Sequence, residues 1–167
     1  MLNIVIGNII ALIASILIIV ISCAKNKKII IILQTIQVAL LTLSNLILGG
    51  IPGAIINAIT IIRNILCYKN KLTKINIIII ATALTILSLL FNNSLIGLLP
   101  LIGTLLYTIF INTKSTIKLK QLILLNMICW GIYDFSIKSY TSAIFELIGT
   151  ITGIISIYQI KNKDKNA

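Results

Sequence analysis

Residues 2–23, LNIVIGNIIALIASILIIVISC, form an apolar stretch without a charged side chain. A transmembrane helix needs about 20 predominantly apolar residues, so this stretch predicts a membrane-spanning helix. The rest of the chain is similar, because 59% of its 167 residues are hydrophobic and only 10% are charged. Such a composition is far from that of soluble domains, and the length leaves no room for an extramembrane catalytic domain. We therefore expect an all-α membrane protein.

Six further apolar runs follow the first, separated by short polar breaks. The seven predicted spans cover residues 2–23, 29–48, 51–68, 75–91, 95–111, 119–137 and 140–160. Gly49 and Gly50 suit the end of one helix, and Pro52 suits the first turn of the next. At about 1.5 Å per residue, each run is long enough to cross the hydrocarbon layer.

Lysines cluster after every second span. Those that follow spans one, three, five and seven are Lys25, Lys27, Lys28, Lys69, Lys71, Lys74, Lys114, Lys118, Lys120, Lys161, Lys163 and Lys165. Only Lys138 falls on the opposite side. The positive-inside rule therefore predicts an outside N-terminus, a cytoplasmic C-terminus and an odd number of spans. We expect the net charge of +11 to face the bilayer surface and its anionic lipid rather than nucleic acid.

The reactive side chains are few. The chain has no His, three acids (Asp134, Glu146 and Asp164) and three scattered cysteines (Cys23, Cys67 and Cys129) without a CxxC pair. This inventory supports neither a disulfide framework nor a metal site, and it contains no dyad of catalytic groups. We expect no enzymatic activity, no catalytic residues and no cofactor.

A polar pattern occurs twice when the chain is shifted by 89 residues against itself. Span three carries Gly53, Asn57, Thr60 and Asn64, and the counterparts in span seven are Ser142, Glu146, Gly149 and Gly153. Span two carries Gln37, Leu41, Ser44 and Asn45, and the counterparts in span six are Asn126, Trp130, Tyr133 and Asp134. Because helix residues three and four apart share a face, each group forms one stripe.

Two repeated units of three spans in the same orientation need an odd number of connecting spans, and span four supplies one. The sequence therefore predicts two parallel three-helix bundles joined by a linker helix, a 3+1+3 arrangement. The expected divisions are 1–70 for the first bundle, 71–92 for the linker helix, 93–163 for the second bundle and 164–167 for a cytoplasmic tail. Parallel repeats of this kind occur in SWEET transporters, whose binding sites lie near mid-membrane between the halves.

Three segments carry a resemblance to a known family: GAIINAITIIRNILCYKNK at 53–71, LLPLIGT at 98–104 and WGIYDFSIKSYTSAIFE at 130–146. The chain resembles the YgjV-type family of bacterial inner-membrane proteins over essentially its whole length. That family looks like a distant relative of SWEET and PQ-loop transporters. The resemblance implies a multi-pass protein of the bacterial inner membrane but assigns no biochemical activity. The matching positions are Asn57, Arg63, Asn64, Pro100, Trp130, Tyr133, Ser139, Tyr140 and Glu146.

Glu146 is the first candidate for a functional site. It lies six residues inside span seven, about 9 Å from the outer end. An unpaired charge inside a membrane costs several kcal/mol, so such a residue indicates a function by default. Glu146 could bind and release protons during transport. The alternative is a protonated carboxyl group that forms a hydrogen bond between helices.

Asn57 is the repeat counterpart of Glu146. In SWEET transporters an Asn pair on the third and seventh helices contacts the sugar, so the resemblance implies that Asn57 and Glu146 occupy the matching places. A carboxylate beside an amide suits a polyol, but it suits a cation or a proton equally well. Asn57 could also serve only as a hydrogen-bonding contact between helices.

Four further candidates for substrate binding lie on the same stripes: Asn45, Trp130, Tyr133 and Asp134. Trp130 is the only Trp and lies in mid-span rather than in an interfacial belt, so its ring either stacks on a sugar or nucleoside or packs in the core. Asp134 is expected near the outer end of span six. There it is hydrated, pairs with Lys138 or contacts the solute.

Two further predictions concern an ion pair and a hinge. Arg63 lies near the cytoplasmic end of span three, where it either extends to the interface or forms an ion pair with Glu146. Pro100 removes a backbone hydrogen bond inside span five. Together with Gly103 it forms either a hinge that gates alternating access or a static kink.

The sequence favours a transporter that moves a small polar solute, sugar-like or other, by alternating access, with proton coupling through Glu146 as an option. The alternative is a non-transporting interaction or scaffold protein of the membrane, with the polar stripes as contacts between helices. A homo-oligomer is compatible with either function.

Overall fold

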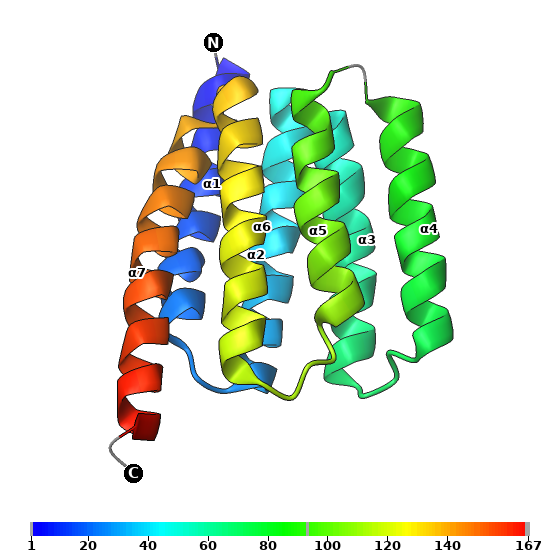
Figure 1. The fold of residues 1–167 in the computed structure, drawn as a ribbon. Helices are drawn as coiled ribbons and strands as arrows, with labels where there is room; N and C mark the ends of the chain where they lie inside the picture. Colours follow the sequence, from blue (N-terminus) through cyan, green and yellow to red (C-terminus); the bar gives the residue numbers. More distant parts are fainter. Residues whose placement is uncertain (1, 93, 166–167) are drawn as a thin grey trace.

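The computed structural model describes residues 2–92 and 94–165. Within these residues the chain forms α1 (Leu2–Cys23), α2 (Lys27–Leu48), α3 (Ile51–Tyr68), α4 (Lys74–Phe91), the 3-10 helix η1 (Ile96–Leu98), α5 (Leu99–Phe110), α6 (Thr116–Ser136) and α7 (Tyr140–Lys165). The seven α-helices correspond to the seven predicted runs and run side by side (Figure 1). Of the predicted tail, residues 164 and 165 belong to α7, whereas 166 and 167 lie outside the described residues.

Local sequence signals set the helix ends. Gly49 ends α2 in the left-handed conformation, with a φ of 79°, and Pro52 lies in the first turn of α3. The side chains of Asn26, Thr73 and Ser115 accept hydrogen bonds from the first turns of α2, α4 and α6. These caps start α2, α4 and α6 one to three residues before the predicted runs.

Five helices of the described chain are long and apolar enough to cross a membrane: α1, α2, α3, α4 and Tyr140–Lys161 of α7. The segment formed by η1 and α5, Ile96–Phe110, is apolar but shorter. In α6, the buried polar residues Lys120 and Asp134 lower the mean hydropathy. The η1–α5 segment therefore falls short of the other five in length, and α6, with 21 residues, falls short of them in hydropathy.

The helices are arranged as a ring. Each of α1, α2 and α3 packs against the next, as do α5, α6 and α7, and the ring is closed by contacts of α1 with α7 and of α3 with α5. The remaining helix, α4, stands at the edge and packs only against α3 and α5 among the major contacts (Figure 1). The ring therefore consists of two rows of three helices, with α4 outside.

Burial in the molecule differs from that in a soluble protein, although apolar side chains also form a buried core. Large apolar side chains such as Ile78 and Leu90 face outward, whereas Asn64, Asp134 and Glu146 are no more than 5% exposed. In lipid, apolar side chains gain nothing by turning inward, and polar groups need partners inside the protein. This distribution fits a protein surrounded by hydrocarbon.

The lysine-rich segments gather at one end of the ring. The segments between α1 and α2, between α3 and α4, and between α5 and α6 lie there, together with the end of α7 (Figure 1). We call this end the basic end. Lys120 is an exception among these lysines, because it is only 3% exposed and its Nζ donates to Ser22 O and Ser156 Oγ, at 2.5 and 3.0 Å.

Candidate functional site

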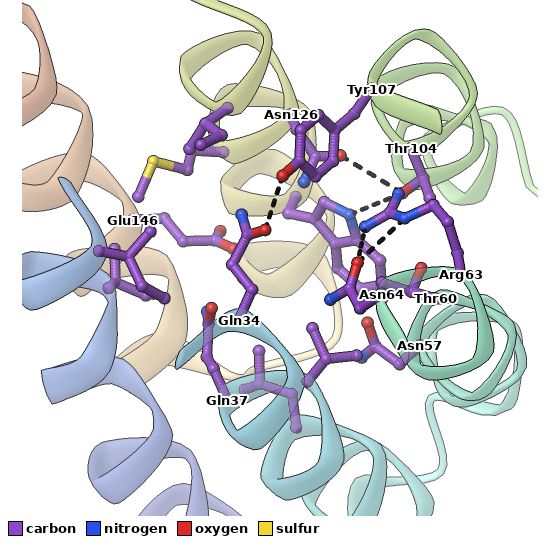
Figure 2. A pocket seen from close by; sticks show the side chains of 17 residues that line it. Gln34, Gln37, Asn57, Thr60, Arg63, Asn64, Thr104, Tyr107, Asn126 and Glu146 are labelled. Carbon is purple, nitrogen blue, oxygen red and sulfur yellow. Dashed lines mark hydrogen bonds between the residues drawn. The ribbon is translucent and has the colours of Figure 1, made fainter. Parts of the chain in front are cut away.

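A cavity of about 50 Å3 lies at the centre of the ring. Every helix of the ring contributes to its wall, and α4 does not. The polar lining residues are Gln34, Gln37, Asn57, Thr60, Arg63, Asn64, Thr104, Tyr107, Asn126, Trp130 and Glu146 (Figure 2). A buried water needs about 10–15 Å3 of such space, so the cavity has room for roughly three to five water-sized groups.

A layer of hydrogen-bonded side chains lies on the side of the cavity that faces the basic end. The Tyr107 hydroxyl donates to Gln34 Oε1 at 2.7 Å, which connects α5 with α2. Arg63 Nη1 donates to Thr108 Oγ1 at 2.9 Å, and Arg63 lies 4.5 Å from the centre of the Tyr107 ring. We call Gln34, Arg63, Asn64, Tyr107 and Thr108 the polar layer.

Arg63 is buried in the polar layer, with 1% of its surface exposed. Its Nε and Nη2 both donate to Asn64 Oδ1, at 3.1 and 2.8 Å. Among the described side chains, no carboxylate pairs with Arg63. This environment differs from both that were predicted, because the guanidinium neither reaches the interface nor contacts Glu146. The hydroxyl of Thr108 and the ring of Tyr107 take the place of an anion.

Three further polar groups of α3 face the cavity without a hydrogen-bond partner. They are Asn57 Nδ2, Thr60 Oγ1 and Asn64 Nδ2. The spacing of three and four residues places them on one face of α3 together with Arg63. Because Asn64 Oδ1 accepts both bonds from Arg63, the free end of this amide is the donor. The α3 wall of the cavity is therefore rich in unused donors.

Glu146 stands on the opposite side of the cavity from Arg63 (Figure 2). Its Oε2 has no hydrogen-bond partner among the described residues, and this oxygen lies 3.2 Å from the position that a Cβ would take at Gly131. Glu146 also borders an apolar groove on the outer face of α6 and α7. It therefore separates the central cavity from the lipid-facing surface.

A second contact between the two rows lies on the side away from the basic end. The backbone N–H of Gly53 in α3 donates to the hydroxyl of Tyr133 in α6 at 3.2 Å. A Cβ at Gly53 would stand 2.7 Å from Asn45 Nδ2 and 3.0 Å from Tyr133 Cε1, so only a glycine allows this approach. Tyr133 and Gly53 thus connect α3 with α6 near the other end of the ring.

Three of the six predicted binding residues, Asn57, Trp130 and Glu146, line the one central cavity. Trp130 is held by a hydrogen bond from its Nε1 to Thr104 Oγ1, at 3.2 Å. The other three, Asn45, Tyr133 and Asp134, are buried but do not line it. Asp134 is 2% exposed rather than hydrated, and its Oδ1 has no partner among the described residues.

Pro100 does not interrupt a helix. It lies in the first turn of α5, directly after η1, where a helix has no backbone hydrogen bond to lose. The prediction that Pro100 removes a backbone hydrogen bond inside span five is therefore wrong. A Cβ at Gly103 would stand 3.0 Å from both Asn126 Oδ1 and Cys129 Cβ, so this glycine permits close packing of α5 on α6.

Several cavity residues were not among the predicted site residues. Gln34, Thr104, Tyr107 and Asn126 line the cavity, and Thr108 belongs to the polar layer without lining the cavity. Gln34 and Gln37 stand three residues apart in an apolar run, as Thr104 and Thr108 stand four apart, and these spacings could have indicated them. Among the described residues, no three His, Cys, Asp or Glu side chains come together as a metal site.

The apolar outer surface, the ring of helices and the polar groups in the interior define a multi-pass α-helical membrane protein with a central cavity. A family model described as a bacterial inner membrane protein, Imp-YgjV, matches residues 5–164. The chain belongs to this family, and it is a multi-pass protein of the bacterial inner membrane. No curated protein and no solved structure was found to match it.

Proposed function

We propose that this protein transports a small polar solute by alternating access through the central cavity, in exchange with or together with a proton on Glu146. The observation that carries this proposal is a cavity with polar lining residues between two rows of helices, flanked by hydrogen bonds that run from one row to the other. Such bonds can break and re-form without disturbing either row.

The repeat of 89 residues supports a site shared by two equivalent halves. Six pairs of lining residues stand 89 positions apart: Ile18 and Tyr107, Gln34 and Ile123, Gln37 and Asn126, Val38 and Met127, Leu41 and Trp130, Asn57 and Glu146. In a repeat related by an axis along the membrane normal, equivalent positions face the same central point. We assign α1 to α3 and α5 to α7 as the halves and α4 as the linker of a 3+1+3 transporter.

Two sets of contacts between the halves, one on each side of the cavity, suit the two gates of such a transporter. Loss of the Tyr107–Gln34 and Arg63–Thr108 bonds would open the cavity toward the basic end, and loss of the Tyr133–Gly53 bond would open it toward the other end. With both in place, the two rows are connected on both sides of the cavity. The α1–α7 contact, which includes the Ser22 Oγ bond to Gly149 O at 3.1 Å, would hold the halves together throughout.

Glu146 is the group that we assign to proton movement. It is 5% exposed and lacks a cationic partner among the described residues, so in the occluded state the neutral, protonated form is favoured. When the cavity fills with water, the charged form becomes accessible. By the positive-inside rule, we assign the basic end to the cytoplasm and the N-terminus to the opposite side.

The experiment is flux into liposomes that contain the purified protein and a pH-sensitive dye. We would screen sugars, polyols, nucleosides and small anions for uptake and for accompanying proton movement. Glu146→Gln should keep uptake down a solute gradient but lose accumulation driven by a pH gradient. Thr152→Val, one to two turns further along α7 and outside the cavity lining, should behave as wild type. Unchanged pH-driven accumulation in Glu146→Gln would exclude the proton role.

The competing function is that of a non-transporting interaction protein of the membrane. The small cavity volume favours it, because buried polar contacts between helices can serve stability alone. Absence of flux for every solute, with a folded protein and one stoichiometric membrane partner that co-purifies, would support this function and exclude transport.

A further inference from the structure

The charge of Arg63 has no counterpart in the described structure. Arg63 is the only Arg of the chain, it stays protonated in proteins, and it is 1% exposed inside the ring. Its hydrogen bonds go to the neutral groups of Asn64 and Thr108. A buried cation without an anion is costly, so an anion that enters the cavity would gain the energy of pairing with it.

The neighbours of Arg63 have the polarity that an anion needs. Three of the five guanidinium N–H groups are used in hydrogen bonds, which leaves two without a partner in the described part of the chain. Asn57 Nδ2, Thr60 Oγ1 and Asn64 Nδ2 are at least nine-tenths buried, line the same cavity and are also unpartnered. An oxyanion can accept hydrogen bonds from groups of this kind, and the free guanidinium N–H groups, Thr60 Oγ1 and Asn64 Nδ2 lie within about one helical turn of one another on α3.

The surroundings also restrict the size of the ligand and suggest its route. The cavity volume of about 50 Å3 suits a group of a few heavy atoms, such as acetate or phosphate, rather than a hexose. At the basic end, a separate recess is lined in part by Lys27, Lys28 and Cys67, and Cys67 lies one helical turn from Arg63 on α3. Lysines at such a mouth raise the local concentration of anions.

We propose that the central cavity binds a compact oxyanion, a carboxylate or a phosphate, through Arg63 and the free donors of α3. This inference rests on the proposed function in that it names the substrate class, but binding can be measured without transport. The planar fork of Arg matches both carboxylate and phosphate, so the two are distinguished by experiment.

The test is equilibrium binding of radiolabelled acetate and of radiolabelled phosphate to the full-length protein in detergent. Neutral acetamide, which has the shape of acetate, is the control ligand. Trp130 lines the cavity and is the only Trp, so its fluorescence gives a second measurement. We expect acetate or phosphate to bind and acetamide not to compete. Arg63→Gln should weaken binding at least tenfold, whereas Lys69→Gln, at the exposed end of α3, should not.

Asn64→Asp tests the same idea without removal of the Arg. It places a carboxylate where Asn64 Oδ1 already accepts two bonds from Arg63, so it supplies the missing counterion. We expect a higher melting temperature without ligand and at least tenfold weaker binding of the oxyanion. Equal binding of acetate and acetamide, or unchanged affinity in Asn64→Asp, would overturn the proposal.

The outcomes separate this inference from the proposed function. Oxyanion binding that depends on Arg63, without flux of any solute, would support the proposed anion site and exclude transport. Flux of a neutral solute together with no oxyanion binding would support the proposed transport function and exclude the anion site.

Discussion

At the scale of single residues, Tyr107 joins the two halves at the polar layer. Its hydroxyl reaches Gln34, and its ring covers the guanidinium of Arg63, so one side chain satisfies a polar group and shields a charge. Gln34 and Tyr107 are both buried, and the bond between them connects positions 73 residues apart in the chain. The strength of this contact should therefore influence how readily the basic end opens.

Tyr107→Phe removes the hydroxyl but keeps the ring over Arg63. The loss of one hydrogen bond between helices should lower the free energy of unfolding by about 0.6–1.7 kcal/mol. It should also increase the labelling of a cysteine in the cavity from the basic end. Tyr158→Phe is the control, because Tyr158 is 66% exposed on α7. Thermal unfolding in detergent measures the first effect, and a melting temperature equal to that of Tyr158→Phe would contradict it.

At the scale of helices, the ring is closed on one side by the close packing of α1 against α7. A Cβ at Gly149 would overlap Ile18 Cγ2 and stand 2.5 Å from Met127 Cε. Ser22 Oγ donates to the carbonyl of the same glycine. The absence of a side chain at Gly149 is thus what allows α1 and α7 to meet, as small residues commonly do in membrane helix pairs.

Gly149→Ala should force α1 away from α7 and reduce the free energy of unfolding by about 1–3 kcal/mol. Gly131→Ala on α6 is the matched control, because its Cβ would meet the flexible end of Glu146 at 3.2 Å and Glu146 Cβ at an ordinary contact distance of 3.6 Å. The comparison is made by thermal or denaturant unfolding of both variants. If the free energy of unfolding falls equally in the two variants, the close approach of α1 to α7 has no special importance for stability.

The helices could be predicted from the sequence to different degrees. The end of α2 and the start of α3 followed from Gly49, Gly50 and Pro52, because these residues have strong local preferences. The order of the helices in space did not follow from hydropathy. Ile78 is 64% exposed and Ile80 only 7%, although the two residues are identical and two positions apart. Which face of α4 packs inward depends on its contacts with α3 and α5.

The candidate site could be predicted in part for the same reason. Polar residues such as Asn57 and Glu146 stand out in an apolar background, so their inward position follows from the cost of polar groups in lipid. The environment of Arg63 could not be predicted, because Thr108 is 45 residues away in the chain and meets Arg63 only through the α3–α5 contact. A periodic pattern identifies a face of a helix but not the residue opposite.

At the scale of the whole molecule, the two rows of helices share one cavity and have separate contacts near its two ends. If the rows move against each other, the same cavity residue must become accessible first from one side of the membrane and then from the other. A rigid bundle with the same contacts would leave that residue inaccessible from both sides. Accessibility of the cavity therefore distinguishes a transporter from a static membrane protein.

The most direct measurement is the labelling of a single cysteine at Asn57 by a membrane-impermeant thiol reagent, applied separately to each side of oriented vesicles. Cys23, Cys67 and Cys129 would first be replaced, and Ile62→Cys, on the outward face of α3, gives the background. We predict that Asn57→Cys reacts from both sides, and that the oxyanion proposed for the cavity, acetate or phosphate, slows both reactions. Reaction from neither side, at the background level of Ile62→Cys, would contradict alternating access.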